Sequence, residues 1–474
     1  MGVKWVFDLF ESLECTDEIV YLPVSPMLSR FPNALVIVLL FILMAGLLCY
    51  VLPMGQYERR QDPATGRAVV VAGSYHAIDA GRIAPFQLLV DIPRGITSGA
   101  EVVVLIFLVG GFFYIVDKSG ALREGIVALA HLVHGREGLA LWVVGLVFAI
   151  GGALEGLQEE IIPVIPVLLI LTQKLGFNRF VTIAISYGAA TVGAMFSPLN
   201  PFGAVIAQKL AEVPFLEGST LRMIAFGVGF SLWMYLVVRY AKANAIVPAT
   251  SSEHEKTTGS SLHWRHQLIL TMAALTFAIL IIGLMAWGWG FNEMSAEFFL
   301  SGLLIGLVGG MGLNGTCLAY VEGFREMTFA AMIIGMSHSI SLVLTDGHIM
   351  DTIIYGLFTP LQYLPAQVSA LGMMLAQAGL HVVVPSYSGQ AVLTIPILIP
   401  VSDLLGLSRD VCVLAFQYGA VVMDMVIPTN GALMAVIALA GIQYNEWFSF
   451  IWKRILLLMA FGGAIILLAI ASGF

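Results

Sequence analysis

The segment from Phe180 to Gln208 contains no charged residue, yet the heptapeptide SPLNPFG, residues 197–203, interrupts it near its centre. An uncharged run of 29 residues exceeds the roughly 20 residues that a helix needs to cross the hydrocarbon layer of a bilayer. Two prolines, a glycine and an asparagine do not fit inside one regular helix, because proline lacks an N–H and clashes with the preceding turn. The segment therefore predicts a membrane-crossing helix that is broken midway.

Apolar stretches of similar length recur along the chain. Of its 474 residues 59% are hydrophobic and only 11% are charged, whereas a typical soluble domain is about 25% charged. The sequence thus predicts an all-α polytopic membrane protein. No basic stripe with interleaved aromatic residues is found, which argues against nucleic-acid binding. The four cysteines are scattered without the spacing of a zinc site or a disulfide framework, so no metal centre is expected from them.

Polar residues divide the chain into a lead-in, two halves and a linker. The lead-in is 1–32, the first half 33–241, the Ser- and Thr-rich linker 242–266 and the second half 267–474. Full crossings are predicted at about 33–53, 97–117, 180–212, 218–241, 267–288, 297–313, 327–345, 410–441 and 447–472, with 180–212 and 410–441 broken.

Two further apolar segments, about 139–175 and 367–405, have Gly, Pro, Ser and Gln near their middles. Each fits two half-length helices that form a re-entrant hairpin, whose tip must be covered by protein or line a wet cavity. The alternative for the first segment is an aqueous loop at Glu155–Glu160 between two ordinary spans.

The two halves are copies of one sequence. When residues 163–200 are placed on residues 393–430 without a gap, 12 of 38 positions are identical, against roughly one in ten expected in so apolar a composition. An odd number of predicted crossings separates the copies, so they face opposite ways and form inverted repeats.

The helix break itself is duplicated, because Pro198 and Asn200 recur as Pro428 and Asn430. A break frees main-chain N–H and C=O groups and exposes half-helix dipole ends, which can hold an ion or a charged solute. Two breaks at matching positions therefore indicate a transport site near the bilayer midplane. The alternative is a pair of proline kinks that only help packing.

Ionisable residues near the tips and breaks are candidates for this site. Glu155, Glu159 and Glu160 lie at the first tip, where charges at membrane depth usually line a cavity or move ions. Asp424 is the only charged residue between Val411 and Tyr444, and both a ligand role and a structural hydrogen bond would explain it. His381 precedes the second tip and is interpreted either as a satisfied core histidine or as a proton relay.

No Lys or Arg falls within either tip or break, so the acidic excess favours a cationic or zwitterionic substrate, or binding of Na⁺ or H⁺. No HExxH or GxSxG motif lies on a span, so the chain is not expected to be an intramembrane enzyme. A channel is a third alternative, although it would not show counterflow.

Several segments resemble one transporter family. They are LPMGQYERR (52–60), EGLQEEIIPVIPVLL (155–169), SPLNPFGAVIAQKLAEVP (197–214), SGQAVLTIPILIPVSDLLGLSR (388–409) and IPTNGALMAVIALAGIQYNEW (427–447). From about residue 33 onward the chain looks like the YfcC-like, basic amino-acid antiporter branch of the C4-dicarboxylate anaerobic carrier family, within the ion transporter superfamily. The acid that often closely follows the Gln-Tyr-Gly element of this branch is displaced here: Ala420 follows Gln417-Tyr418-Gly419, and the acid comes at Asp424.

The resemblance implies a homodimer in the bacterial inner membrane, with a fixed scaffold and an elevator-type transport domain that carries two hairpins and two broken helices. It implies secondary transport of a small charged metabolite, with arginine- or ornithine-like amino acids first and Na⁺- or H⁺-coupled C4-dicarboxylate transport as the alternative. No cofactor is implied beyond Na⁺, near Asn200 and Asn430, or H⁺ as the coupling ion. With Asp424, the site residues it implies are Glu159, Glu160, Ser197, Asn200, Ser386, Ser388, Gln390, Thr429 and Asn430.

Overall fold

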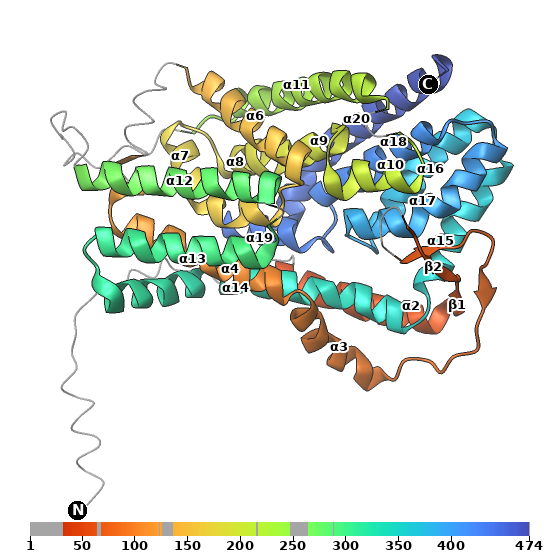
Figure 1. The fold of residues 1–474 in the computed structure, drawn as a ribbon, viewed down its shortest axis with the longest axis horizontal. Helices are drawn as coiled ribbons and strands as arrows, with labels where there is room; N and C mark the ends of the chain where they lie inside the picture. Colours follow the sequence, from red (N-terminus) through yellow and green to blue (C-terminus); the bar gives the residue numbers. More distant parts are fainter. Residues whose placement is uncertain are drawn as a thin grey trace, which may run out of the picture. The chain divides into compact units, whose positions relative to one another are not determined.

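The computed structural model describes residues 32–63, 68–122, 124–125, 136–214, 217–246, 264–287 and 289–473. The predicted lead-in, apart from Pro32, and residues 247–263 of the predicted linker lie outside the described residues. Over the described ranges, eight helices are long and apolar enough to cross a membrane. The chain is therefore a multi-pass helical protein (Figure 1).

One set of helices packs on α14, the longest of the described helices, or on helices that contact it, and we call it the α14 group. It consists of α2 (Ala34–Val51), α3 (Pro85–Ser98), α4 (Ala100–Lys118), α12 (Trp264–Trp287), α13 (Phe291–Val308) and α14 (Gly312–Asp346). Its apolar core is built from α4, α12, α13 and α14, with Phe112 edge-on to Phe298. Glycines allow α4 and α14 to approach closely, because a Cβ atom at Gly323 would lie 2.5 Å from the Cα atom of Gly111.

The segment between the first two spans holds structure that the all-α interpretation does not include. Four short strands form two antiparallel pairs, β1 (Gly55–Gln56) with β4 (His76–Ala77) and β2 (Arg59–Gln61) with β3 (Ala68–Val70). The helix α3 follows them and has Pro85 in its first turn, where proline is well tolerated. Strands of two or three residues carry too little alternation to be recognised in a sequence.

The other helices form a second set, which we call the hairpin group. In the first half it contains α6 (Glu137–Glu155), η1 (Glu159–Val164), α7 (Ile165–Lys174), α8 (Arg179–Ile183), η2 (Ala184–Gly188), α9 (Ala189–Phe196), η3 (Pro201–Val205), α10 (Ile206–Leu210) and α11 (Ser219–Ala243). In the second half it contains α16 (Ala366–His381), α17 (Tyr387–Leu404), α18 (Arg409–Ala420), η5 (Val421–Met425), α19 (Gly431–Leu439) and α20 (Tyr444–Ala471). The short helix α15 (Met350–Phe358) and the 3-10 helix η4 (Thr359–Tyr363) lead into α16.

The segment Arg179–Leu210 is the innermost of the membrane-length segments. About 94% of its most apolar window is buried, compared with 28% for Glu137–Leu154. It runs as α8, η2 and α9 as far as Phe196 and starts again at Pro201. The second half repeats this course, because the chain runs helically from Arg409 to Met425 and starts again at Gly431.

The first arm of each helical hairpin packs on the first part of a broken helix, and small residues make this possible. Gly152 and Gly193 bring α6 against α9, and Gly419 brings α18 against the main chain of α16. The two hairpins differ in length, because α6 has 19 residues and counts among the eight membrane-length helices, whereas α16 has 16.

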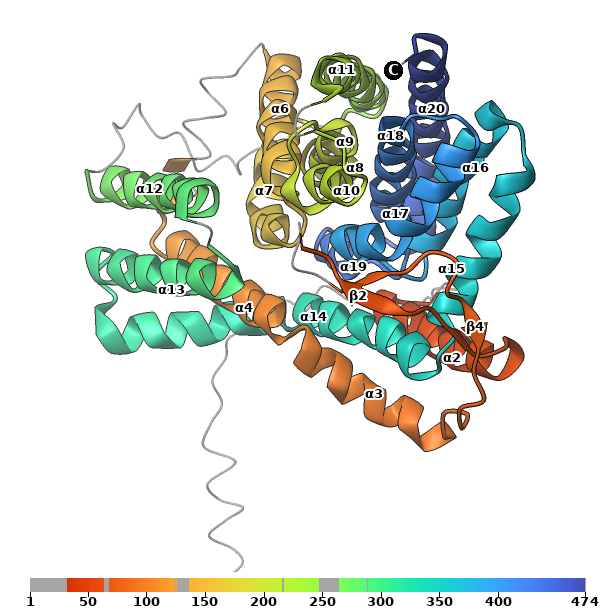
Figure 2. The ribbon, with the colours of Figure 1, turned by 45° about the vertical axis from the view of Figure 1, so that its right-hand side comes forward.

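The two halves of the hairpin group exchange contacts. The arm α17 of the second hairpin packs on α10 of the first half, and η1 and α7 of the first hairpin pack on α19 of the second half. Figure 2 shows α8–α10 lying beside α17 and α18, with α19 between them and α14. Each broken helix is thus completed by the hairpin of the other half.

Candidate substrate and ion site

The first helix break is fixed by two side chains that the sequence singles out. Ser197 accepts hydrogen bonds from the N–H groups of Leu199 and Asn200, both at 2.9 Å, and donates to the carbonyl of Ala153 at 2.5 Å. Asn200 accepts from the N–H groups of Phe202 and Gly203 at 3.0 Å. Asn200 is thus the N-cap that starts the second part of the broken helix, whereas Ser197 ends α9 and holds the turn between the two parts. Both side chains are buried.

The second break is fixed in the same way. The Oδ1 atom of Asn430 accepts from the N–H of Leu433 at 2.8 Å and from the hydroxyl of Tyr187 at 3.2 Å. Thr429 donates to the carbonyl of Val382, at the end of α16, at 2.8 Å. The amide oxygens of Asn200 and Asn430 both accept from helix-start N–H groups, and sodium binding near these residues stays a prediction.

Asp424 lies in the turn η5 beside the second break, and three elements converge on its carboxylate. Its Oδ1 atom accepts from the Nδ2 of Asn430 at 2.7 Å and lies 2.8 Å from the Nε2 of His381. Its Oδ2 atom accepts from the Nε2 of Gln158, in the first hairpin tip, at 2.6 Å. The side chain of Asp424 is only 3% exposed. Both hairpins and the second broken helix therefore meet at one carboxylate.

A cavity of about 520 Å³ opens at this meeting point. Of the ten site residues proposed from the sequence, eight line it: Glu159, Glu160, Asn200, Ser386, Ser388, Asp424, Thr429 and Asn430. Ser197 and Gln390 lie behind the lining, Ser197 in the cap of the first break and Gln390 in contact with His381. The described residues that line this cavity include three carboxylates and no Lys or Arg.

The sequence interpretation missed several polar residues here. Gln158 and Tyr187 bind Asn430, and His338 of α14 lines the cavity. Gln158 is adjacent to the acidic pair in the motif LQEE, which is the only signal that could have drawn attention to it.

The sequence interpretation also missed Arg222, which is a fully buried cation in α11. It pairs with Asp410 at 3.0 Å and donates through Nε to the side-chain oxygen of Gln417 at 3.0 Å. Gln417 in turn donates to the carbonyl of Ser197 at 2.8 Å. Arg222 therefore links α11, α18 and the first break without lining the cavity.

Removing the Arg222 charge is expected to destabilise the protein strongly. Arg222→Met leaves Asp410 buried without its partner, and breaking one side of a buried pair costs about 3–5 kcal/mol. Arg325→Met is the control, since Arg325 pairs with Glu322 on an exposed helix face and such pairs contribute at most about 1 kcal/mol. Melting temperatures in detergent compare the two variants, and equal losses would show that the buried network does not support the fold.

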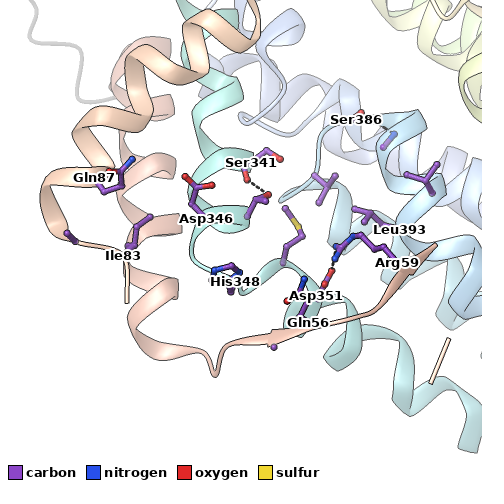
Figure 3. Close-up of a pocket in the computed structure, with 17 residues that line it drawn as sticks. Gln56, Arg59, Ile83, Gln87, Ser341, Asp346, His348, Asp351, Ser386 and Leu393 are labelled. Atoms are coloured by element: carbon purple, nitrogen blue, oxygen red, sulfur yellow. Dashed lines mark hydrogen bonds and ion pairs between the residues drawn. The ribbon is translucent and has the colours of Figure 1, made fainter. Parts of the chain in front are cut away.

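A second cavity of about 920 Å³ adjoins the first (Figure 3). The two share Ser341, Val384 and Ser386 in their linings. On its far side Arg59 of β2 pairs with Asp351 of α15 at 2.9 Å. This second cavity is lined by residues of the strands, the end of α14 and the second hairpin, so the tip of that hairpin lies between the two cavities.

Two broken helices and two helical hairpins around an acidic cavity, in a chain with eight membrane-length helices, form the architecture of a multi-pass membrane transporter. Residues 31–471 match the family model of the C4-dicarboxylate anaerobic carrier. The chain belongs to this family, as the sequence resemblance predicted.

Individual relatives have been found in bacteria. The chain is 29% identical over 467 residues to the putative basic amino acid antiporter YfcC of Escherichia coli, covering 88% of this chain and 92% of the relative. It is 27% identical over 419 residues to an uncharacterized protein of Haemophilus influenzae, covering 85% and 82%. Solved structures with some likeness are the YdaH transporter of Alcanivorax borkumensis (16% identity, coverage 94% and 99%, TM-score 0.43) and MtrF of Neisseria gonorrhoeae (16%, 92% and 95%, TM-score 0.39).

Proposed function

We propose that the protein is a secondary active transporter of a small cationic amino acid, of the arginine or ornithine type. The observation that carries this proposal is the charge of the central cavity, whose described lining has Glu159, Glu160 and Asp424 and no basic residue. An isolated anion would meet like charges there, whereas a guanidinium or ammonium group would pair with them. The name of the Escherichia coli relative, a putative basic amino acid antiporter, is consistent with this choice.

The carboxylate of an amino acid substrate also has a place. The helices α17 and α19 begin at Tyr387 and Gly431, and both residues line the cavity. The first N–H groups of a helix lack partners within the helix and carry partial positive charge, so they bind carboxylates. The substrate would thus lie with its α-carboxylate at these helix starts and its cationic side chain toward Glu159 and Glu160.

The packing supports an elevator mechanism, in which the hairpin group moves against the α14 group. The groups meet mainly where α14 packs on α19 and where α4 packs on η1, while most other contacts lie inside one group.

The exchange of contacts between the halves supports inverted repeats, since a two-fold axis in the membrane plane would produce it. We further propose that the α14 group forms a homodimer in the bacterial inner membrane.

The second candidate substrate is a C4-dicarboxylate, which the family name suggests. The same two helix starts would hold its carboxylates. Binding of a dicarboxylate would require that the lining acids be protonated or neutralised by a coupling cation. Otherwise its two carboxylate groups would approach three ionised carboxylates at a large electrostatic cost.

Counterflow in proteoliposomes tests the proposal. Vesicles loaded with unlabelled arginine, ornithine, lysine, glutamate or succinate receive labelled arginine outside. Loading with arginine, ornithine or lysine is expected to drive transient accumulation of label, and loading with glutamate or succinate is not. A second set of vesicles, loaded with unlabelled succinate, receives labelled succinate outside. Accumulation of label in this set, without any arginine counterflow in the first, would instead establish a dicarboxylate as the substrate. Equilibration of label without overshoot would indicate a channel.

A further inference from the structure

The contacts of His381 determine how many protons its ring carries. The imidazole is fully buried between Gln390, whose Oε1 lies 2.6 Å from Nδ1, and Asp424, whose Oδ1 lies 2.8 Å from Nε2. Each ring nitrogen can donate only if it bears hydrogen, and neutral imidazole has a single N–H. The orientation of the two neighbours therefore decides the protonation state.

Main-chain carbonyls fix the Gln390 amide, because a carbonyl oxygen can only accept. The hydroxyl of Thr394 donates to the carbonyl of Gln390 at 2.9 Å, and Gln377 donates to that hydroxyl oxygen at 2.8 Å. The NH₂ group of Gln390 donates to the carbonyl of Gln377 at 2.8 Å and to its side-chain oxygen. The remaining atom of the amide, Oε1, thus faces His381 as an acceptor, and Nδ1 must carry a hydrogen.

The carboxylate of Asp424 is fixed from the opposite direction. The Leu433 N–H points the oxygen of Asn430 toward the start of α19, so its NH₂ group faces Asp424 and Gln158. Asp424 then receives one donor on Oδ2 from Gln158 and one on Oδ1 from Asn430. Oδ1 and Nε2 must share one more hydrogen between them, since two bare acceptors at 2.8 Å would repel.

We infer that His381 and Asp424 form a proton-binding site at the edge of the substrate cavity, and that this proton is exchanged for the cationic substrate. With the proton bound, the pair is an imidazolium N–H donating to a carboxylate and is neutral overall. When the proton leaves Nε2, a lone pair of the ring faces Oδ1, and Asp424 becomes available to the cavity that it already lines. A guanidinium or ammonium group can then take the place of the N–H donor.

This inference rests on the proposed function only for the identity of the cation. Because proton and substrate compete for one carboxylate, each substrate that binds releases one proton, and the apparent affinity falls about tenfold per unit decrease in pH where the pair is protonated. Other titratable groups also face the pair: Glu159 and Glu160 from the first hairpin tip, Tyr187 from η2, Tyr387 from α17 and His338 from α14. The measurement must therefore be a difference between variants.

The ring state can be read directly, without any transport. In substrate-free protein carrying ¹⁵N-labelled histidine, one buried ring is expected to show both nitrogens protonated at neutral pH, and His381→Gln should remove this signal. Should His381→Gln fail to fold, Gln390→Glu, which keeps an acceptor near Nδ1, assigns the signal by shifting it. A His381 ring with a single N–H would overturn the inference, whatever the protein transports.

Proton exchange is then followed in vesicles that contain a pH-sensitive dye. Addition of arginine outside wild-type vesicles is expected to raise the luminal pH as protons leave, and Asp424→Asn should abolish this rise. Gln443→Ala is the control, since Gln443 lies at the start of α20 outside the cavity lining. If the protein shows arginine counterflow in loaded vesicles but arginine does not raise the luminal pH in the dye assay, the inference is overturned and the proposed function stands. A dually protonated ring in a protein without arginine counterflow would overturn only the proposed substrate.

Discussion

Replacing both acids of the first hairpin tip, Glu159→Gln with Glu160→Gln, is expected to abolish arginine counterflow. Each substitution keeps the size of the side chain and removes one charge from the cavity lining. Charge-assisted hydrogen bonds contribute about 1.5–3 kcal/mol each, so each single variant should weaken binding roughly 10- to 100-fold and the pair should lose it. Labelled arginine uptake and a thermal-shift titration with arginine give the two readouts.

Glu212→Gln is the matched control, because the side chain of Glu212 is 79% exposed and pairs with Arg409 outside the cavity lining. It should transport like the wild type. Unchanged arginine affinity in the double variant would remove the hairpin tip from the site, and a gain of succinate transport in the same variant would point to an anionic substrate.

A disulfide between α14 and α19 is expected to stop transport in a reversible way. A Cβ atom at Gly431 would lie 3.2 Å from the hydroxyl oxygen of Ser337, so a sulfur atom in the place of that oxygen would lie within reach of a cysteine at residue 431. In protein without Cys15 and Cys317, oxidation of Ser337→Cys with Gly431→Cys should lock the hairpin group onto the α14 group. Uptake should fall to background, and because Ser337 and Gly431 also line the central cavity, arginine should raise the melting temperature less than it does in the reduced protein.

The readout is the recovery of uptake when the disulfide is reduced. The comparison is made within this variant because Gly431→Cys alone crowds Ile334 and is expected to slow transport by itself. The control pair is Thr172→Cys with Thr182→Cys, which joins two helices of the hairpin group. The hydroxyl oxygens of Thr172 and Thr182 lie 2.5 Å apart. Its oxidation should leave transport unchanged. Full transport by the oxidised 337–431 pair would rule out relative movement of the two groups at this contact.

Much of the architecture could be predicted because membrane segments obey few rules. Uncharged runs predict helices, and a proline with an asparagine inside such a run breaks the helix and caps the next one, as Asn200 and Asn430 do. Strands β1–β4 could not be predicted, since each has only two or three residues and their segment is fixed by contacts with distant elements, such as the bond from the Tyr57 N–H to Asp351. The helix α3 has two prolines and is too short to cross a membrane, and its place is set by its packing on α14.

Individual residues of the site could be predicted better than the contacts between them. Isolated charges such as Asp424 stand out in an apolar sequence, and the tips stand out by composition. Nothing in the sequence indicates that His381 lies between Gln390 and Asp424, or that Arg222 reaches Asp410, because these contacts join segments that are up to 188 residues apart. Such contacts exist only once the helices have packed.

The exchange of contacts between the halves has a consequence for biosynthesis. The first half leaves the ribosome before α17 and α19 have been made, so the first hairpin and the second part of its broken helix enter the membrane without the elements that cover them. Until the second half is inserted, the acids at the first tip have no finished cavity to line. We therefore expect assembly of this transporter to be a late, cooperative event in which both halves complete each other, rather than the docking of two independently folded units.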